Sequence, residues 1–261
     1  DGSSRDTTGR LRAYHEATGI AALTAGDPDA GDDFGKRRRF RVDRLDMATG
    51  EVAPLLTVEQ AAAVPVAGIT ALQALRDHGL LQSGQQVLIN GASGGVGTFA
   101  VQIAKVLGAH VTGVCSGKNV EMVKSIGADH VIDYSKEDFW LGGKEYDLIV
   151  DNAAFYSIRK PLRVLKATGI YVGIGGSSST ASVLQSLIFN PIIAKMKGRR
   201  VASFIANVNQ ADLVFMKEHL EAGKVVPVID RKYPLSETPE AIRYVEKGHT
   251  RGNGVITLDE K

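Results

Sequence analysis

The sequence predicts an α/β protein built on a doubly wound parallel sheet with helices on both faces. Two observations support this prediction. A short apolar run, Gln86–Asn90, leads through a glycine-rich turn into a pattern of helical spacing that begins at Thr98. Downstream, apolar runs of strand length alternate with helical patterns as far as Ala222, which is typical of parallel strands joined by crossover helices.

The turn between this strand and helix, Gly91-Ala-Ser-Gly-Gly-Val-Gly97, is typical of a dinucleotide-binding unit. A helix N-terminus offers unpaired N–H groups and a positive dipole end to a pyrophosphate, and glycines let the backbone approach it closely. Two spacings fit the turn. Gly91, Gly94 and Gly97 fit G-x-x-G-x-x-G, whereas Gly91, Gly95 and Gly97 fit the G-x-x-x-G-x-G of short-chain dehydrogenases, so the turn alone leaves the family open.

The first fifty residues differ in composition from the rest of the chain. They are rich in Gly, Asp, Ser, Thr and Arg, and no segment shows clean strand alternation. We expect this segment to be largely irregular, with one possible helix at Leu11–Leu23. The basic run Lys36–Arg39 is interpreted as a solvated loop.

Regular structure is expected to begin near Leu55. Thr57-Val-Glu-Gln60 fits a capping box ahead of a helix over residues 61–63. Gly68–His78 also has helical spacing. After the glycine turn we expect strands at His110–Cys115, His130–Ile132, Asp147–Asp151, Gly169–Gly173 and Arg200–Ile205, and helices at Thr98–Leu107, Asn119–Ile126, Ile158–Leu165, Val183–Asn190, Ile192–Met196 and Gln210–Ala222, with a loop at 175–180.

The C-terminal part is predicted to contain two strands and one helix. Gly223–Ile229 is predicted to be a strand, and Pro227 within it indicates that the strand lies at the edge of a sheet. A helix is expected at Glu237–Lys247, followed by a last strand at Gly254–Leu258.

Composition excludes several classes of protein. The net charge of +2 is too small to indicate a nucleic-acid-binding protein, and no apolar run is long enough to cross a membrane. The single cysteine, Cys115, excludes an internal disulfide and a multi-cysteine zinc site, and the histidines show no metal-ligand spacing. No signal peptide is visible, so the expectation is a cytoplasmic protein without a metal site.

The end of the second strand of the unit indicates which dinucleotide binds. In NAD-binding units an acidic residue there holds the ribose hydroxyls. Here the strand leads into Ser116, Gly117 and Lys118, with no acid before Glu121. A hydroxyl and an ammonium suit a 2′-phosphate, so the predicted cofactor is NADP(H). Cys115 is interpreted as a small buried apolar residue rather than a nucleophile.

A Tyr-x-x-x-Lys string, Tyr156 to Lys160, keeps a short-chain dehydrogenase open as an alternative. In that family the lysine lowers the tyrosine pKa so that the hydroxyl can act as an acid. The string lies only about 60 residues after the glycine turn, and that family needs about twice as many, so the spacing disfavours this alternative. A zinc alcohol dehydrogenase is disfavoured as well, because the cysteine ligands are missing.

Five segments carry a family resemblance: AAAVPVAGITALQAL, VLINGASGGVGTFAVQIAK, GVCSGKN, SIGADHVIDY and the closing GKVVPVIDRKYPLSETPEAIRYVEKGHTRGNGVITL. Taken together and in this order, they resemble the zinc-independent quinone oxidoreductase branch of the medium-chain dehydrogenase/reductase superfamily. The resemblance covers about Val52 to Leu258 and implies a Rossmann cofactor domain with NADPH as the hydride donor. Two positions depart from the family: Gly117, where it often has threonine, and Asn253, where it usually has lysine.

Residue by residue, the resemblance also implies roles around the cofactor. The Asn253 departure puts in doubt one polar contact from the C-terminal strand. The implied cofactor-binding residues are Gly94, Gly95 and Val96 at the pyrophosphate, Ser116, Lys118 and Tyr134 around the 2′-phosphate, and Asn152, Gly173, Ile174, Gly175 and Thr70 at the nicotinamide half.

The front of the chain departs most from the family, which carries a β-rich, chaperonin-like catalytic domain there. We therefore expect residues 1–54 to be an irregular segment that replaces most of that domain, with only a remnant of it left. Residues 55–206 are expected to form the NADP-binding Rossmann domain, and residues 207–261 a helix and strands that return to the catalytic lobe. Since one wall of the substrate cleft would be missing, we expect weak or absent activity.

The implied activity is NADPH-dependent reduction of a quinone, an enone or a related reactive carbonyl compound. Such chemistry needs no strong general base, so no catalytic residue is named. The alternative is a truncated or regulatory relative that binds NADP(H) without turnover. The expected partners are a small-molecule substrate and a second copy of the chain, paired at the sheet edge formed by Arg200–Ile205.

Overall fold

The computed structural model describes the backbone of residues 10–15, 20–25, 41–46 and 52–54, and residues 57–154, 156–174, 199–248 and 250–257. The chain divides into two compact units, Asp1–Ala61 and Ala62–Lys261. The predicted helices at 183–190 and 192–196 and the predicted loop at 175–180 lie outside the described residues.

The first unit contains an antiparallel sheet, which corrects the prediction of an irregular segment with a helix at Leu11–Leu23. The backbone groups there are paired between strands rather than within a helix, with Tyr14 opposite Ala21. The alternation of polar and apolar residues in Arg10-Leu-Arg-Ala13 is the sequence signal that favours a strand. The sheet has the order β1 (Arg10–His15), β2 (Ile20–Ala25), β3 (Arg41–Asp46) and β4 (Val52–Pro54).

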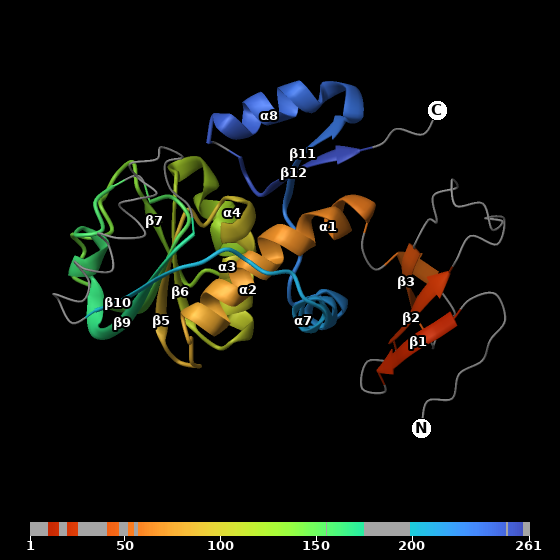
Figure 1. The fold of residues 1–261 in the computed structure, drawn as a ribbon, viewed down its shortest axis with the longest axis horizontal. Coiled ribbons are helices and arrows are strands. Elements are labelled where there is room, and N and C mark those ends of the chain that lie inside the picture. The colour runs from red at the N-terminus through yellow and green to blue at the C-terminus, as the bar shows by residue number, and fades with distance from the viewer. Residues whose placement is uncertain are drawn as a thin grey trace. The chain divides into compact units, whose positions relative to one another are not determined.

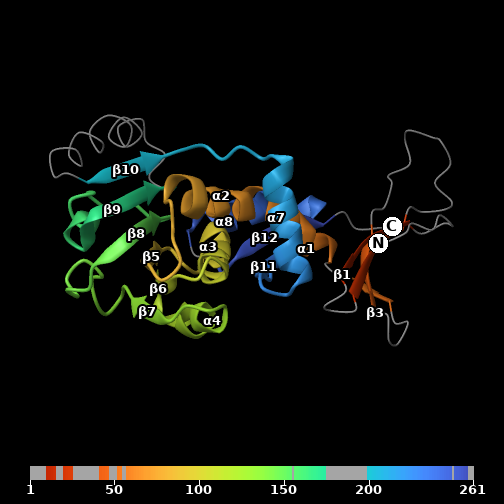
Figure 2. The same ribbon diagram turned by 90° about the horizontal axis from the view of Figure 1, so that it is seen from below.

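The second unit is built on a six-stranded parallel sheet, which confirms the predicted fold class (Figure 2). Counted along the chain within this sheet, its order is 6-5-4-1-2-3, the order of a doubly wound dinucleotide-binding fold. The order reverses between β5 and β8, where such folds bind their ligands. The strands are β5 (Gln86–Asn90), β6 (His110–Cys115), β7 (His130–Asp133), β8 (Tyr146–Asp151), β9 (Leu165–Gly173) and β10 (Arg200–Ser203).

The helical run at Val58–His78 begins at the predicted capping box. Thr57 N donates to Gln60 Oε1 (3.0 Å), and Gln60 N donates to Thr57 Oγ1 (3.2 Å). Helices α2, α3 and α4 lie along one face of the parallel sheet (Figure 2). The run comprises α1 (Val58–Ala63), the wider turn η1 (Val64–Gly68), α2 (Ile69–Gln73) and η2 (Ala74–His78), and the later helices are α3 (Gly95–Val106) and α4 (Val120–Ser125).

Strand β5 is buried on both faces, as expected for a central parallel strand. Val87, Leu88 and Ile89 are all fully buried. Leu88 packs in one apolar cluster with Tyr146 and Ile149 of the neighbouring strand β8. The strand that leads into the glycine turn is therefore fixed in position from both sides.

The prediction of a helix at Ile158–Leu165 is wrong. Only a short 3-10 turn, Pro161–Arg163, forms, and Leu165 already begins β9. Leu165 pairs with Tyr146, and Tyr146 N donates to Val164 O (2.8 Å). Pairing with the sheet therefore prevails over a helical pattern in which Pro161 supplies no N–H.

The strand predicted at Gly223–Ile229 is also wrong, because a side chain takes the place of a strand partner. Gln102 on α3 accepts from Val226 N (2.7 Å) and donates to Val226 O (3.0 Å). The chain becomes a strand only at Ile229. The observed elements are α7 (Gln210–Glu221), β11 (Ile229–Pro234), α8 (Thr238–Glu246) and β12 (Asn253–Thr257).

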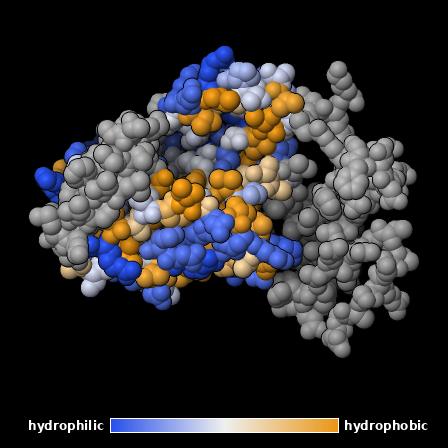
Figure 3. Space-filling view, viewed as in Figure 1, coloured by the Kyte–Doolittle hydropathy of each residue, from blue (hydrophilic) through white to orange (hydrophobic). Residues whose placement is uncertain are grey.

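Strands β11 and β12 form a small parallel sheet beside α8 (Figure 1). Several apolar side chains of this part are exposed among charged ones, as the hydropathy-coloured surface shows (Figure 3). They are Leu235, Ile242, Val245 and Ile256. Within the described residues, no helix has the length and apolar character needed to cross a membrane.

Candidate functional site

The predicted cofactor-binding residues gather at one edge of the parallel sheet. Gly91, Ser116, Tyr134, Asn152 and Ile174 each follow directly after a strand, in the order β5, β6, β7, β8 and β9. Because the strands are parallel, their carboxyl ends meet at the same edge, where doubly wound folds bind ligands. Gly175 lies outside the described residues.

The three glycines of the G-x-x-G-x-x-G spacing have three different structural roles. Gly91 has φ +73°, which favours glycine. Gly94 is the extended residue before α3, and a β-carbon there would meet only Gly91 O, at 3.5 Å. At Gly97 a β-carbon would lie 2.0 Å from Gly91 O, so only glycine lets the helix pack against the turn. The turn thus matches G-x-x-G-x-x-G.

The N-terminus of α3 is open to a ligand. Gly94 precedes the helix and has no side chain to cap it. The N–H groups of the first helical residues, Gly95 and Val96, have no partner within the helix. Open space at Gly94, N–H groups without a side-chain cap and the positive end of the helix dipole together fit a pyrophosphate.

The C-terminal segment lies against the glycine turn, a contact that the sequence reasoning missed. Gly252 pairs with Gly94 in an isolated parallel bridge, and Gly252 N donates to Ser93 O (2.8 Å). A β-carbon on Gly95 would lie 2.7 Å from Asn253 Oδ1, so the Asn253 side chain packs closely over the turn. Gly252 and Gly254, on either side of Asn253, were the sequence signal that could have predicted this close approach.

The loop after β6 carries the predicted 2′-phosphate residues. Ser116 is half-buried and Lys118 is exposed. Beneath them lies Asp133 of β7, a second residue that the sequence reasoning missed; a β-carbon on Gly117 would meet its Oδ2 at 2.6 Å. Hydrogen bonds from Ser135 lower the pKa of Asp133, so this carboxylate is ionised at neutral pH. Gly117 is glycine here because threonine would collide with it.

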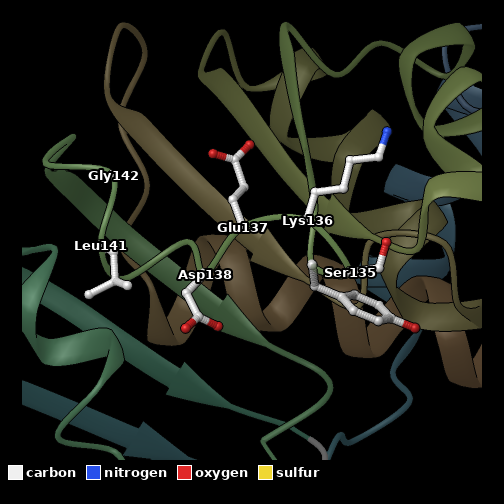
Figure 4. A pocket seen from close by; sticks show the side chains of 7 residues that line it. Ser135, Lys136, Glu137, Asp138, Leu141 and Gly142 are labelled. Carbon is white, nitrogen blue, oxygen red and sulfur yellow. The ribbon is translucent and has the colours of Figure 1, made fainter.

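Tyr134 also borders a shallow cavity of about 540 Å³ that opens after β7 (Figure 4). Its lining is mixed in charge, and Figure 4 shows the Lys136 and Glu137 side chains extending from the same loop. The cavity shares only Tyr134 with the predicted site, so it borders that site without containing the glycine turn. The lining residues are Tyr134, Ser135, Lys136, Glu137, Asp138, Leu141 and Gly142.

A buried polar network lies at the point where the strand order reverses. Asp151 is fully buried at the end of β8 and accepts hydrogen bonds from Asn90 Nδ2, Tyr156 Oη and Tyr171 Oη, each at 2.8 Å. Burial first, and then the nearby Asp151, raise the pKa of both tyrosines, so both hydroxyls remain donors at neutral pH. Asn152 Nδ2 donates to Asn90 O (3.0 Å), while Asn152 Oδ1 is buried with no partner among the described residues.

The short-chain dehydrogenase alternative does not fit this geometry. Tyr156 is bound to Asp151, and its pKa is raised rather than lowered. The Lys160 ammonium lies over the Trp140 ring, 4.4 Å from the ring centroid. Lys160 therefore has a different partner from the one that an activated tyrosine requires.

The structure also shows the surroundings of Cys115 and Thr70. Burial first, and then Asp133, raise the pKa of Cys115 to about 11, which confirms it as a buried thiol rather than a nucleophile. Thr70 is buried on α2, and its Oγ1 donates to Val66 O (2.7 Å) within its own helix. Among the described residues, no three His, Cys, Asp or Glu side chains group as a metal site would require.

Comparison with known proteins places this geometry in a family. Residues 126–256 match the family described as zinc-binding dehydrogenase. The chain belongs to this family. Its homologues include quinone oxidoreductases of the medium-chain dehydrogenase/reductase superfamily, so the superfamily predicted from the sequence segments is confirmed, whereas zinc independence stays a prediction.

Individual members of the superfamily resemble the chain over most of its length. It is 37% identical over 225 residues to the mouse NAD(P)H oxidoreductase RTN4IP1, mitochondrial, covering 78% of this chain and 56% of that protein. It is 35% identical to the chloroplast envelope quinone oxidoreductase homolog of Arabidopsis thaliana, covering 76% and 61%. The quinone oxidoreductase structure from Coxiella burnetii superimposes with a TM-score of 0.71 at 26% identity, covering 91% of this chain and 78% of that one.

The chain therefore spans less than two thirds of the length of these two curated relatives. Their names describe oxidoreductases.

Proposed function

We propose that the chain is an NADPH-dependent, zinc-independent oxidoreductase that transfers hydride to a quinone, an enone or a related reactive carbonyl compound. The observation that carries the proposal is the open, uncapped N-terminus of α3 behind Gly91, Gly94 and Gly97, at the point where the strand order reverses. A dinucleotide is the ligand whose pyrophosphate suits that position.

The residues at the carboxyl edge fit the different parts of NADPH. Asn152 Oδ1, a buried acceptor without a partner in the part of the chain that the structure describes, suits an N–H donor such as a carboxamide. In this proposal Gly94, Gly95 and Val96 bind the pyrophosphate, Ser116, Lys118 and Tyr134 surround the 2′-phosphate, and Asn152, Gly173, Ile174, Gly175 and Thr70 line the nicotinamide half.

When bound, the dihydronicotinamide supplies the hydride, and the protein supplies binding and orientation. The Asp151 network stiffens the ends of β5, β8 and β9, because it joins Asn90, Asp151 and Tyr171 across three adjacent strands. A rigid edge holds a ligand in one orientation toward a second reactant, which is the contribution that hydride transfer needs from this chain. No side chain is proposed as an acid or base.

The proposal extends to the organisation of the chain. Residues 55–206 are proposed as the NADP-binding domain and residues 207–261 as the return to the catalytic lobe. The sheet in residues 1–54 is proposed as the remnant of the catalytic domain. A cytoplasmic location remains a prediction, since the two curated relatives are described as mitochondrial and of the chloroplast envelope.

A quinone-dependent NADPH oxidation assay tests the function. We expect NADPH to be oxidised only when the quinone or enone acceptor is present, at a rate to be compared with the enzyme median of about 10 per second. NADPH binding with no oxidation in the presence of quinones or enones would favour the alternative, a relative that binds NADP(H) without turnover. Absence of both binding and oxidation would contradict both proposals.

Lys118→Ala tests the preference for NADPH. Only NADPH presents a 2′-phosphate, so the substitution should weaken NADPH binding by about three- to tenfold and leave NADH nearly unchanged, since an exposed charge is well screened. Fluorescence titrations with both cofactors, at low and high salt, measure the effect, which should shrink as salt rises. Lys224→Ala, an exposed lysine after α7, is the matched control. Equal weakening of both cofactors would show that Lys118 only supports its loop.

We also propose that the chain forms a homodimer through β10. This strand is the last of the parallel sheet, and Ile205 just beyond it is 96% exposed, so an apolar strand edge is left open for pairing. Sedimentation at micromolar concentration should show concentration-dependent association, and Ile205→Glu should reduce it. Leu141→Glu, an exposed leucine on the loop after β7, should not. A monomer at every concentration would contradict the dimer.

A further inference from the structure

Asn119 lies at the N-terminal boundary of α4, but its side chain does not cap that helix. Asparagine at this position ordinarily accepts a hydrogen bond from a backbone N–H of the first turn. Here the residue is only 3% exposed, and its Nδ2 donates to Ser93 Oγ (3.1 Å) and Ser116 Oγ (3.2 Å). Asn119 therefore joins the glycine turn to the loop after β6, instead of stabilising its own helix.

The direction of these hydrogen bonds determines what the two serine hydroxyls can do. The Asn119 amide has two N–H hydrogens, and one points to each serine. Each Oγ accepts, so its own hydrogen remains available for another acceptor. Within the described part of the chain, neither Ser93 nor Ser116 donates that hydrogen to a protein group.

The other end of the Asn119 amide supports this arrangement. Its Oδ1 is buried without a partner among the described residues. Reversing the amide would present Oδ1 to the serines and would use both hydroxyl hydrogens on the asparagine. The orientation found therefore keeps two donors free at the cost of one unpaired acceptor.

We propose that Asn119 is a positioning residue that fixes the hydroxyls of Ser93 and Ser116 as donors toward the 2′-phosphate of NADP(H). The inference rests on the proposed cofactor. An ionised phosphate only accepts hydrogen bonds, whereas a ribose hydroxyl both donates and accepts, so two hydroxyls held as donors favour the phosphate. The exposed ammonium of Lys118, in the same loop as Ser116, adds a positive charge to this donor set.

The test compares two small ligands that differ only in the 2′-phosphate, adenosine 2′,5′-bisphosphate and 5′-AMP, by calorimetric titration of the whole chain. The wild type should prefer the bisphosphate by about tenfold or more. Asn119→Ala should reduce that preference to about threefold or less, because the hydroxyls can then turn away. In a Ser116→Ala background, Asn119→Ala should have a smaller effect on the preference, since one of the hydroxyls that it orients is gone.

Asn119→Asp provides a second variant if the alanine variant does not fold. Aspartate has the same shape and only accepts, so both hydroxyls would turn toward it and the preference should be lost. Its charge also repels phosphate, so the titration is repeated at high salt, where that repulsion is screened. Thermal unfolding of each variant checks that the fold is intact.

Four outcomes would overturn the inference. Equal weakening of both ligands by Asn119→Ala would show that the residue only supports the loop. In a second outcome, Asn119→Ala in the Ser116→Ala background reduces the preference for the bisphosphate as much as it does in the wild type. In a third, Asn119→Asp keeps that preference at high salt. Either of these two results would show that the serine hydroxyls are not oriented by Asn119. A wild type without any preference for the bisphosphate would overturn the NADPH proposal as well, which distinguishes the two failures.

Discussion

Gly94→Val is expected to abolish dinucleotide binding while the protein stays folded. Gly94 has extended backbone (φ −83°, ψ 177°), which valine adopts readily, and a β-carbon there would have only Gly91 O nearby, at 3.5 Å. The valine methyl groups would instead occupy the open space in front of the α3 N-terminus, where the pyrophosphate is proposed to bind. We expect at least a hundredfold loss of NADPH affinity, about 2.7 kcal/mol, by fluorescence titration.

Two matched substitutions separate this effect from a loss of folding. Gly142→Val changes a glycine on the loop after β7 where a β-carbon would meet only Phe139 O, at 3.9 Å, so cofactor affinity and stability should both stay unchanged. Gly97→Val should unfold or strongly destabilise the protein, because its β-carbon would lie 2.0 Å from Gly91 O. Unaltered NADPH affinity in a folded Gly94→Val variant would contradict the assignment of the glycine turn.

The elements that sequence reasoning predicted correctly are those with local signals. Strands β5 and β6 have the predicted bounds, because each is an apolar run bounded by turn residues. The capping box at Thr57 and Gln60 also forms as predicted, since it depends on residues three apart. The predicted fold class followed from the spacing of such elements.

The errors in the second unit have a common physical cause, which is pairing between residues far apart in the chain. Leu165 belongs to a sheet because Tyr146 lies opposite it, and Val226 is held by the Gln102 side chain. The contacts of Gly252 and Asn253 with the glycine turn likewise join segments far apart in sequence. Local patterns carry little information on such contacts, and the candidate site depends on several of them.

The Asp151 network is expected to carry more stability than any exposed ion pair of the chain. Asp151→Ala leaves Tyr156 Oη, Tyr171 Oη and Asn90 Nδ2 without their buried acceptor, and each unsatisfied donor costs about 1–3 kcal/mol. Asn90 keeps its bond to Tyr156 (2.7 Å), and the buried charge is removed, so we expect a total loss of about 3 kcal/mol.

Urea unfolding measures this loss at neutral pH. Glu121→Ala is the control: the side chain of Glu121 is 86% exposed and pairs with Lys124 (3.1 Å), so its removal should cost at most about 1 kcal/mol. Equal losses in the two variants would show that the buried network contributes no more than a surface pair.

The same network predicts how stability changes at alkaline pH. Burial and Asp151 raise the pKa of Tyr156 and Tyr171, so the folded protein keeps both protons at a pH where the unfolded chain, with tyrosine pKa near 10, begins to lose them. The unfolded state then binds fewer protons than the folded state, and the free energy of unfolding falls as pH rises above about 10. Each tyrosine contributes about 1.4 kcal/mol per pH unit to this fall. Tyr171→Phe should therefore make the fall shallower in urea titrations, by about half a proton at pH 10 and nearly one proton at pH 11. A slope identical to that of the wild type would show that folding does not raise the pKa of Tyr171.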